Sequence, residues 1–136
     1  MLQPLKFNLN VMLLILLLLF LDTAAQIFFK IGVTNLGEFP VESFSAIVKY
    51  AVQLASNPFV IGGIVALIFA FFTWLILISK ADLSFAHPMT SLVYATIPLC
   101  SSWLLDESYS WKQLTGVILI VLGVFVISKD DTQLNH

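Results

Sequence analysis

Four apolar stretches, separated by short polar links, limit this chain to structures that a lipid bilayer can hold. They run over about 9–29, 59–79, 83–105 and 112–128. A helix crosses a bilayer with about 20 predominantly apolar residues. The chain is 60% hydrophobic and 10% charged, whereas soluble domains are about 45–50% apolar and about 25% charged. The sequence therefore predicts an all-α membrane protein, a four-transmembrane-helix bundle in a single domain over residues 1–136.

The first stretch has a second interpretation, as a cleavable signal peptide. Lys6 precedes its leucine-rich part, and Thr23-Ala24-Ala25 resembles a small-residue cleavage site. Apolar residues resume after Ala25 and three further spans follow, which favours a retained membrane helix.

Between the first and second spans, residues 41–55 have an amphipathic pattern. Apolar residues recur there at helical spacing, and polar residues such as Glu42 and Lys49 occupy the other face. We expect a short helix that lies in the membrane interface or across the mouth of the bundle, because the segment is too polar to span. A plain loop is the alternative.

The third stretch is the most polar of the four. It contains His87, Tyr94 and several serines and threonines, together with Pro88 and Pro98. Each proline removes a helical hydrogen bond and can bend the helix, and neighbouring hydroxyl groups can satisfy the freed backbone. Bends suit a bundle that changes shape, but static bundles contain them too.

The charged residues do not predict the orientation of the chain in the membrane, and they argue against a nucleic-acid partner. All six basic residues are lysines. Four spans would place three of them on each side of the membrane: Lys6, Lys80 and Lys129 on one, and Lys30, Lys49 and Lys112 on the other. Because lysine and arginine bias sets orientation, either orientation or both remain open. The net charge of −2 argues against a nucleic-acid partner.

The first span carries the strongest candidates for a functional site. Asp22, Gln26 and Lys30 follow one another at intervals of four residues and so lie along one stripe of the helix. An aspartate at the centre of a span costs about 2.5–3.5 kcal/mol on insertion scales, so such groups turn toward the bundle interior or a watery cavity. Asp22 is a candidate proton or cation site. Alternatively, Asp22 stays hydrated near the membrane surface and Lys30 is a snorkelling anchor.

Two residues of the third span are candidate contacts in the same cavity. His87 lies about one turn inside the span, where a neutral imidazole can hydrogen-bond and can titrate near physiological pH. The alternative is a histidine near the headgroups with an ordinary partner. Tyr94, on the same polar helix, is a further candidate for contact with a substrate.

The fourth span carries small residues on one face. Gly116, Leu119, Ile120 and Gly123 share a stripe that leaves room for close helix approach. We interpret it as a self-association face, with packing inside one chain as the alternative. Cys100 has no partner for a disulfide or a metal site. No catalytic motif, metal-ligand spacing or phosphate-binding glycine loop is present, so we expect no enzyme, no metal and no cofactor.

Taken together, these residues resemble the drug/metabolite transporter superfamily, in particular its four-helix members. These are the small multidrug resistance proteins and the related EamA-like proteins and aminoarabinose-phosphoundecaprenol flippase subunits. The resemblance covers nearly the whole chain. In small multidrug resistance proteins an intramembrane glutamate precedes a lysine by eight residues at the end of the first helix, and Asp22 and Lys30 hold that spacing. The aspartate departs from this pattern and shortens the reach of the carboxylate.

Other residues distinguish the branches of the superfamily. The segment 82–92 is similar to the third-helix opening of the flippase and EamA-like branches, in which Ala-Tyr-Pro is common, and His87 stands at the tyrosine. Gln26, four residues before Lys30, is also similar to the flippase branch. The tryptophan of the multidrug branch in the middle of the third helix has no counterpart near Thr96. The resemblance therefore implies a lipid-linked or small metabolite substrate.

The implied function is a multi-pass transporter of the bacterial inner membrane, whose first three helices line a cavity. Residues 116–124 are similar to the segment by which small multidrug resistance proteins dimerise, which implies a homodimer or a heterodimer with a related chain. The even lysine distribution motivates an antiparallel dimer. One alternative is a proton-coupled small multidrug exporter, and another is a non-transporting helper subunit of a larger membrane complex. The amphipathic insert is longer than the usual connection in these families.

Overall fold

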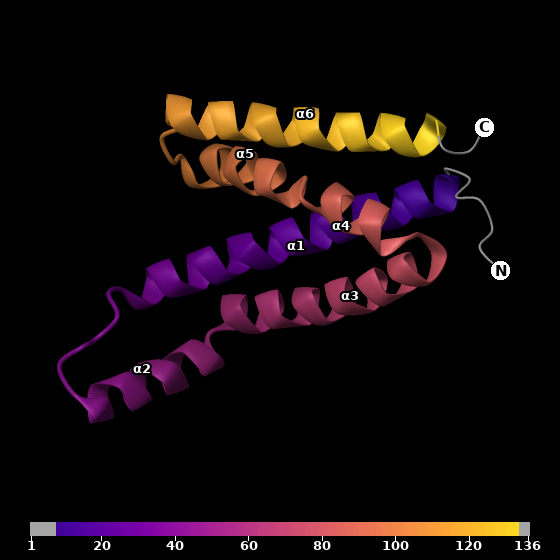
Figure 1. Cartoon of the computed structure of the whole chain (residues 1–136). Helices are drawn as coiled ribbons and strands as arrows, with labels where there is room; N and C mark the ends of the chain where they lie inside the picture. Colours follow the sequence, from indigo (N-terminus) through magenta and orange to yellow (C-terminus); the bar gives the residue numbers. More distant parts are fainter. Residues whose placement is uncertain (1–7, 134–136) are drawn as a thin grey trace.

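The computed structural model describes residues 8–133, and all regular structure in that range is helical. The prediction of an all-α protein is confirmed. The helices are α1 (Leu9–Leu36), α2 (Phe44–Ser56), α3 (Pro58–Lys80), α4 (Leu83–Thr90), α5 (Val93–Leu105) and α6 (Trp111–Gln133) (Figure 1).

Three helices of the described chain are long and apolar enough to cross a membrane: α1, α3 and the Trp111–Asp130 part of α6. They make the chain a multi-pass membrane protein. The predicted third span, 83–105, is instead divided into α4 and α5, and each of these alone is shorter than the roughly 20 residues of a span. The start of α1, the end of α6 and the turn from α3 to α4 lie at the same end of the molecule (Figure 1).

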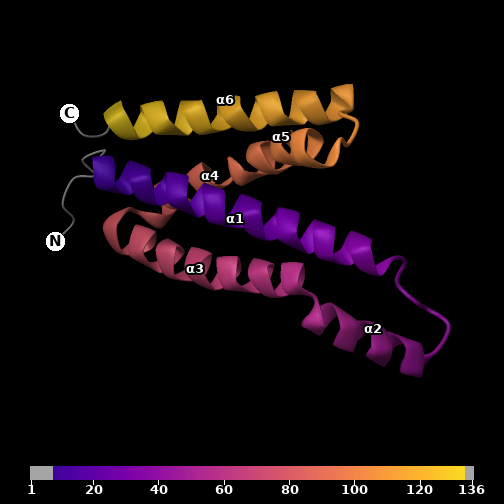
Figure 2. The same cartoon turned by 180° about the vertical axis from the view of Figure 1, so that it is seen from behind.

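The helix α1 occupies the middle of the bundle. Figures 1 and 2 show α3 on one side of it and α4, α5 and α6 on the other. The core follows this arrangement, because buried side chains of α1 meet those of α3 and α4. On α6, Val124 is buried and Ile120 packs against the core.

Small residues bring α1 and α3 into close contact. A Cβ atom added to Gly63 of α3 would lie 2.7 Å from a ring carbon of Phe29, and one added to Gly32 of α1 would lie 2.6 Å from Val60. Both distances are shorter than non-bonded carbons tolerate. Glycine at these two positions therefore lets the helix backbones approach, as in other membrane helix pairs.

The first two helices differ from prediction mainly in their ends. α1 continues two turns past the expected end at residue 29, because nothing after Lys30 breaks the helix until Gly37, whose φ is 83°. The amphipathic segment folds as α2, so it is not a plain loop. Its first turn is capped by Ser43, whose hydroxyl accepts a hydrogen bond from the Ala46 amide. Figure 1 shows α2 beyond the ends of α1 and α3.

The break between α4 and α5 falls at Ser91 and Leu92. The amide of Ser91 donates to the Pro88 carbonyl and that of Leu92 to the Met89 carbonyl, so each bond reaches back three residues instead of four. Such a turn is wound more tightly than an α-helix. Pro88 cannot donate a backbone hydrogen bond to the carbonyl of Ser84, so a second irregularity of the ladder lies one turn earlier, inside α4.

A short polar link, residues 106–110, joins α5 to α6. It begins at Asp106, which has a left-handed backbone conformation with φ of 53°. The Ser102 hydroxyl donates to the backbone carbonyl of Glu107 at 3.0 Å, so the link folds back against the end of α5. This fold brings the Glu107 side chain toward α1.

Candidate functional site

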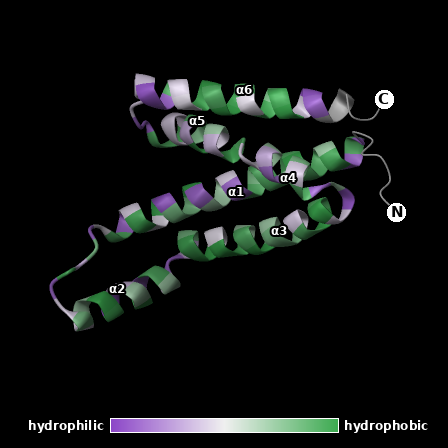
Figure 3. Cartoon of the chain, viewed as in Figure 1, coloured by the Kyte–Doolittle hydropathy of each residue, from purple (hydrophilic) through white to green (hydrophobic). Residues whose placement is uncertain are grey.

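The polar residues of α1 interrupt an otherwise apolar bundle. Figure 3 shows hydrophilic bands along the C-terminal half of α1, whereas α3 is hydrophobic over most of its length. Successive steps of four residues rotate a stripe by about 40° because an α-helix has 3.6 residues per turn. The stripe therefore winds around α1, so Asp22 and Lys30 face different neighbours and line two different cavities.

The first cavity, of about 350 Å³, is formed by α1, α3 and α4. Asp22 and His87 line it together with Trp74, and its remaining walls are Leu18, Leu67, Ala70, Phe71 and Thr90. The Trp74 and His87 rings meet edge to face, with centroids 5.8 Å apart. The cavity thus combines one carboxylate, one imidazole and two aromatic rings.

These groups suit a positively charged or proton-carrying ligand. A carboxylate attracts a cation directly, and aromatic faces attract cations through their quadrupole. Asp22 lies within a membrane-spanning helix, where an ionisable side chain is costly unless it meets a partner or water. Asp22 therefore needs a partner or water, and this cavity is the place where it can meet one.

The second cavity, of about 410 Å³, lies nearer the C-terminal end of α1. It is formed by α1, α5 and the polar link, and is lined by Gln26, Ile27, Phe29, Lys30, Val33, Ile97, Ser101 and Glu107. The Lys30 ammonium nitrogen lies 3.1 Å from one oxygen of Glu107. The Ser101 hydroxyl donates to the other oxygen at 2.6 Å.

Glu107 is an ionised carboxylate held by two donors. The hydrogen bond from Ser101 and, after it, the contact with Lys30 hold the pKa of Glu107 below its ordinary value. The chain covers both members of the ion pair only in part, with 56% of the Lys30 side chain and 44% of the Glu107 side chain exposed. Exposed pairs of this kind are screened by water and salt and hold weakly.

A hydrogen bond between threonines joins α1 to α5 next to these cavities. The hydroxyl oxygens of Thr23 and Thr96 lie 2.8 Å apart. Thr23 is buried, and the Thr96 hydroxyl also contacts the Val93 carbonyl at 3.1 Å. This hydrogen bond holds α1, at the residue after Asp22, against α5, the helix that also carries Ser101.

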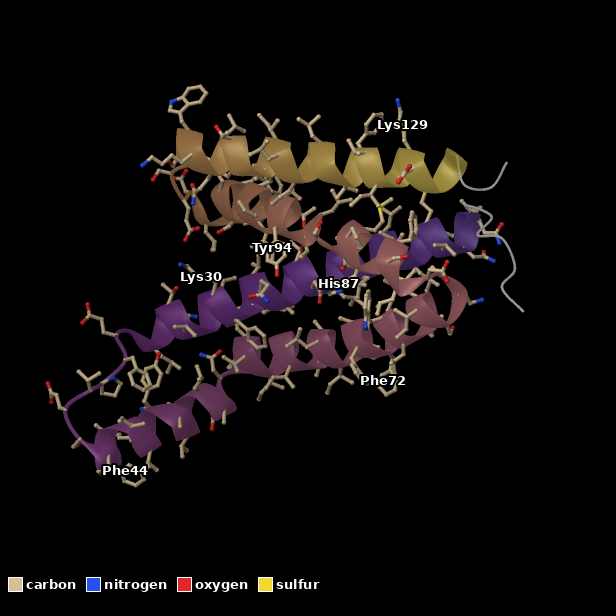
Figure 4. The ribbon with its side chains drawn as sticks, in the orientation of Figure 1. Lys30, Phe44, Phe72, His87, Tyr94 and Lys129 are labelled. Carbon is tan, nitrogen blue, oxygen red and sulfur yellow. The ribbon has the colours of Figure 1, made fainter. Side chains whose placement is uncertain are left out.

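The structure brings the predicted site residues together in pairs. Asp22 and His87 line the first cavity, and Gln26 and Lys30 line the second. Tyr94 lies between Lys30 and His87 along the molecule (Figure 4), but its side chain is 65% exposed and lines neither of these two cavities. The tight turn after Pro88 rotates α5 relative to α4, which separates Tyr94 from the face of His87.

The predicted self-association stripe lies largely on the outside of α6. Leu119 is 64% exposed, and a Cβ atom added to Gly116 or Gly123 would meet nothing within 4 Å. Ile120, by contrast, packs against the core of its own chain. Self-association through this face stays a prediction.

The cavity residues that the sequence analysis did not predict include Trp74, Phe71, Ser101 and Glu107. Trp74 and Phe71 come from α3, for which the sequence predicted a span and no site residue. A tryptophan inside a span, six residues before its end at Lys80, was the available signal, because membrane tryptophans concentrate at the interfaces. Ser101 and Glu107 come together only because the link after α5 folds back. No spacing rule gives that fold.

The sequence is similar to those of several known membrane proteins. The chain is 29% identical over 117 residues to a probable 4-amino-4-deoxy-L-arabinose-phosphoundecaprenol flippase subunit ArnF of Proteus mirabilis (strain HI4320), covering 83% of this chain and 87% of the relative. It is 36% identical over 67 residues to the probable ArnF of Erwinia tasmaniensis, covering 48% and 53%. It is 35% identical over 66 residues to the probable ArnE of the same organism, covering 48% and 61%.

Three apolar helices make the chain a multi-pass membrane protein, and the relatives it resembles are named as flippase subunits. More closely, the chain is similar to the aminoarabinose-phosphoundecaprenol flippase subunits, and the resemblance to the small drug/metabolite transporters is confirmed. The relatives are named as flippase subunits, which are transporters and not enzymes. No family model matches the chain. No solved structure matches it either.

Proposed function

We propose that this chain moves a lipid-linked phosphorylated molecule across the bacterial inner membrane. The supporting observation is the pair of cavities along α1, one with a carboxylate and an imidazole and the other with an ammonium and a hydroxyl. The substrate in the relatives' names carries both an amino group and a phosphate on a polyprenyl chain. An amine suits the cavity of Asp22, and a phosphate suits Lys30.

The proposal includes a fourth span and a dimer. Together α4 and α5 cover residues 83–105, the length of one span with a bend inside it. The relatives are called subunits and carry two names, ArnE and ArnF, which supports pairing with a related chain as well as with a second copy. The open glycines Gly116 and Gly123 give α6 a surface on which another helix can pack closely.

The test is transport by purified protein in proteoliposomes. A fluorescent polyprenyl-phosphate sugar is placed in the inner leaflet, and its arrival outside is measured with an impermeant quencher. We expect Asp22→Asn and Lys30→Gln each to lower the rate at least about tenfold, because each removes a charge that the headgroup contacts. Lys80→Gln is the matched control, since it removes one lysine charge outside both cavities.

The outcomes separate the proposal from its rivals. Equal rates for the wild type and both cavity variants would refute the assignment of the cavities to the substrate. Movement only after a related second chain is added would establish a heteromeric transporter. No movement in either case would favour a helper subunit that does not transport.

A second candidate function is a proton-coupled multidrug exporter. It is favoured by Trp74 and Phe71, which add aromatic walls beside Asp22 although the expected third-helix tryptophan is absent. Proton release on addition of a quaternary ammonium cation to detergent-solubilised protein tests it. Release by the wild type that disappears in Asp22→Asn would support the exporter and contradict the lipid substrate. No release, together with saturable lipid binding, would support the lipid-linked substrate.

A further inference from the structure

Glu107 occupies the cationic end of the Lys30 cavity with a carboxylate of the chain itself. One carboxylate oxygen contacts the Lys30 ammonium at 3.1 Å, and the other accepts the Ser101 hydroxyl hydrogen at 2.6 Å. Both donors are cavity-lining residues. A negatively charged oxygen group thus already fills the place where these donors would hold an anionic ligand.

We propose that Glu107 is a displaceable internal counter-ion, which competes with the phosphate of an incoming ligand for Lys30 and Ser101. When the phosphate enters, its oxygens accept the hydrogen bonds of Lys30 and Ser101, and Glu107 moves out into water. No covalent bond forms or breaks. The inference deepens the proposed function and rests on it, because it assumes that a phosphate group reaches this cavity.

The geometry makes this exchange inexpensive. Glu107 comes from the polar link, outside any helix, so its side chain can leave without breaking the backbone hydrogen bonds of α5 or α6. The ion pair is partly exposed, and exposed pairs contribute little to stability. A phosphate, like a carboxylate, accepts charge-assisted hydrogen bonds from lysine, so Lys30 keeps an anionic partner throughout the exchange.

The competition also gives the cavity a selectivity rule. A neutral headgroup offers Lys30 no negative charge to replace that of Glu107, so the Lys30–Glu107 ion pair stays intact. An anionic headgroup replaces one ion pair with another. Glu107 therefore discriminates between ligands by charge, although it does not itself bind the ligand.

The experiment measures binding of a radiolabelled polyprenyl monophosphate to full-length protein in detergent. Wild type, Glu107→Gln, Lys30→Gln and the double variant are compared, with inorganic phosphate as competitor in a second arm. We expect Glu107→Gln to bind about two- to fivefold more tightly, the factor to which the coupling energy of an exposed ion pair converts. Lys30→Gln should bind more weakly, and Glu107→Gln should give no gain in the Lys30→Gln background.

Glu42→Gln is the matched control for net charge. It removes one negative charge from the segment before α2, and Glu42 does not line the Lys30 cavity. Its affinity should equal that of the wild type if the gain in Glu107→Gln depends on the freed Lys30. Competition by inorganic phosphate would show that the phosphate alone is recognised, and competition only by the lipid would assign the contact to a lipid-borne phosphate.

Unchanged or weaker binding by Glu107→Gln would overturn the inference and make Glu107 a residue that positions Lys30. An equal gain in Glu42→Gln would overturn it as well, because the effect would then be one of general charge. The proposed function can fail separately. If proteoliposomes show no lipid movement while Glu107→Gln still tightens phosphate binding, the counter-ion inference is supported and the transport proposal is refuted.

Discussion

The contact between α1 and α3 and the outer surface of α6 use glycine in opposite ways. In the α1–α3 contact, Gly32 and Gly63 lie against Val60 and Phe29, with no room for a further atom. On α6, a Cβ atom at Gly116 or Gly123 would meet nothing within 4 Å. Glycine therefore allows a close helix contact between α1 and α3. On α6 it lies on a surface that no other part of the described chain covers.

This difference separates the two tasks of a small membrane protein. The α1–α3 contact sets the walls behind Asp22, because α3 supplies Trp74 and Phe71 to that cavity. α6 contributes no residue to either cavity described above. The helices that hold the site are thus packed against each other within the chain, and α6, the least buried of the three spans, carries the face for which we propose self-association.

The largest expected effect comes from filling the α1–α3 contact. Gly63→Leu should lower the free energy of unfolding by about 1–3 kcal/mol or more, because the added side chain forces Phe29 and the backbone of α1 away from α3. Thermal unfolding in detergent measures it.

The matched control for that variant is Gly123→Leu on α6. It should raise stability by about 0.5–1 kcal/mol in the monomer, because glycine is a poor helix former and the added side chain meets open space. Equal destabilisation by the two variants would break the comparison between the regions. Cross-linking then asks whether Gly123→Leu also weakens self-association, as the predicted face requires.

A middle-sized effect is expected at the polar contact between α1 and α5. Thr23→Val keeps the shape of the side chain but removes the hydrogen bond to Thr96, so we expect a loss of about 0.6 kcal/mol, the average for such bonds between membrane helices. Thermal unfolding of Thr23→Val, Thr96→Val and the double variant gives the coupling. Strictly additive effects would show that the two hydroxyl groups do not stabilise one another.

The smallest effect concerns the ion pair that ties α1 to the link before α6. Because the pKa of Glu107 is lowered in the folded protein, the stability that it contributes is present above its ordinary value of 4.5 and is lost as the pH falls through the folded pKa. The melting temperatures of wild type and Glu107→Gln should therefore differ slightly at neutral pH and converge in acid. A difference that persists after Glu107 is protonated would assign the contribution to Ser101 or to packing.

The sequence was sufficient to predict the features that periodicity and solvent preference control. Apolar length predicted the helices α1, α3 and α6, and the pattern over 41–55 predicted α2. The stripe of Asp22, Gln26 and Lys30 was also correctly placed on one helix. Its division between two cavities was not foreseen, because spacing gives a rotation along α1 but does not identify the helix that each residue meets.

Two other features depend on contacts that no local pattern contains. The position of Tyr94 depends on the tight turn at Ser91 and Leu92, and proline alone does not say how far a helix is rewound. The pairing of Glu107 with Lys30 joins residues 77 positions apart through a link folded back by Ser102. Such long-range pairings emerge only when the whole chain is packed.

The length of α1 sets how deeply each polar group lies in the membrane. At about 1.5 Å per residue, its 28 residues extend for about 42 Å, more than the roughly 30 Å of hydrocarbon in a bilayer. Asp22 is near the midpoint of the helix, and Lys30 is about 12 Å closer to one surface. In the proposed transport, a headgroup would travel less than half the hydrocarbon thickness between Lys30 and the second charged side chain, Asp22.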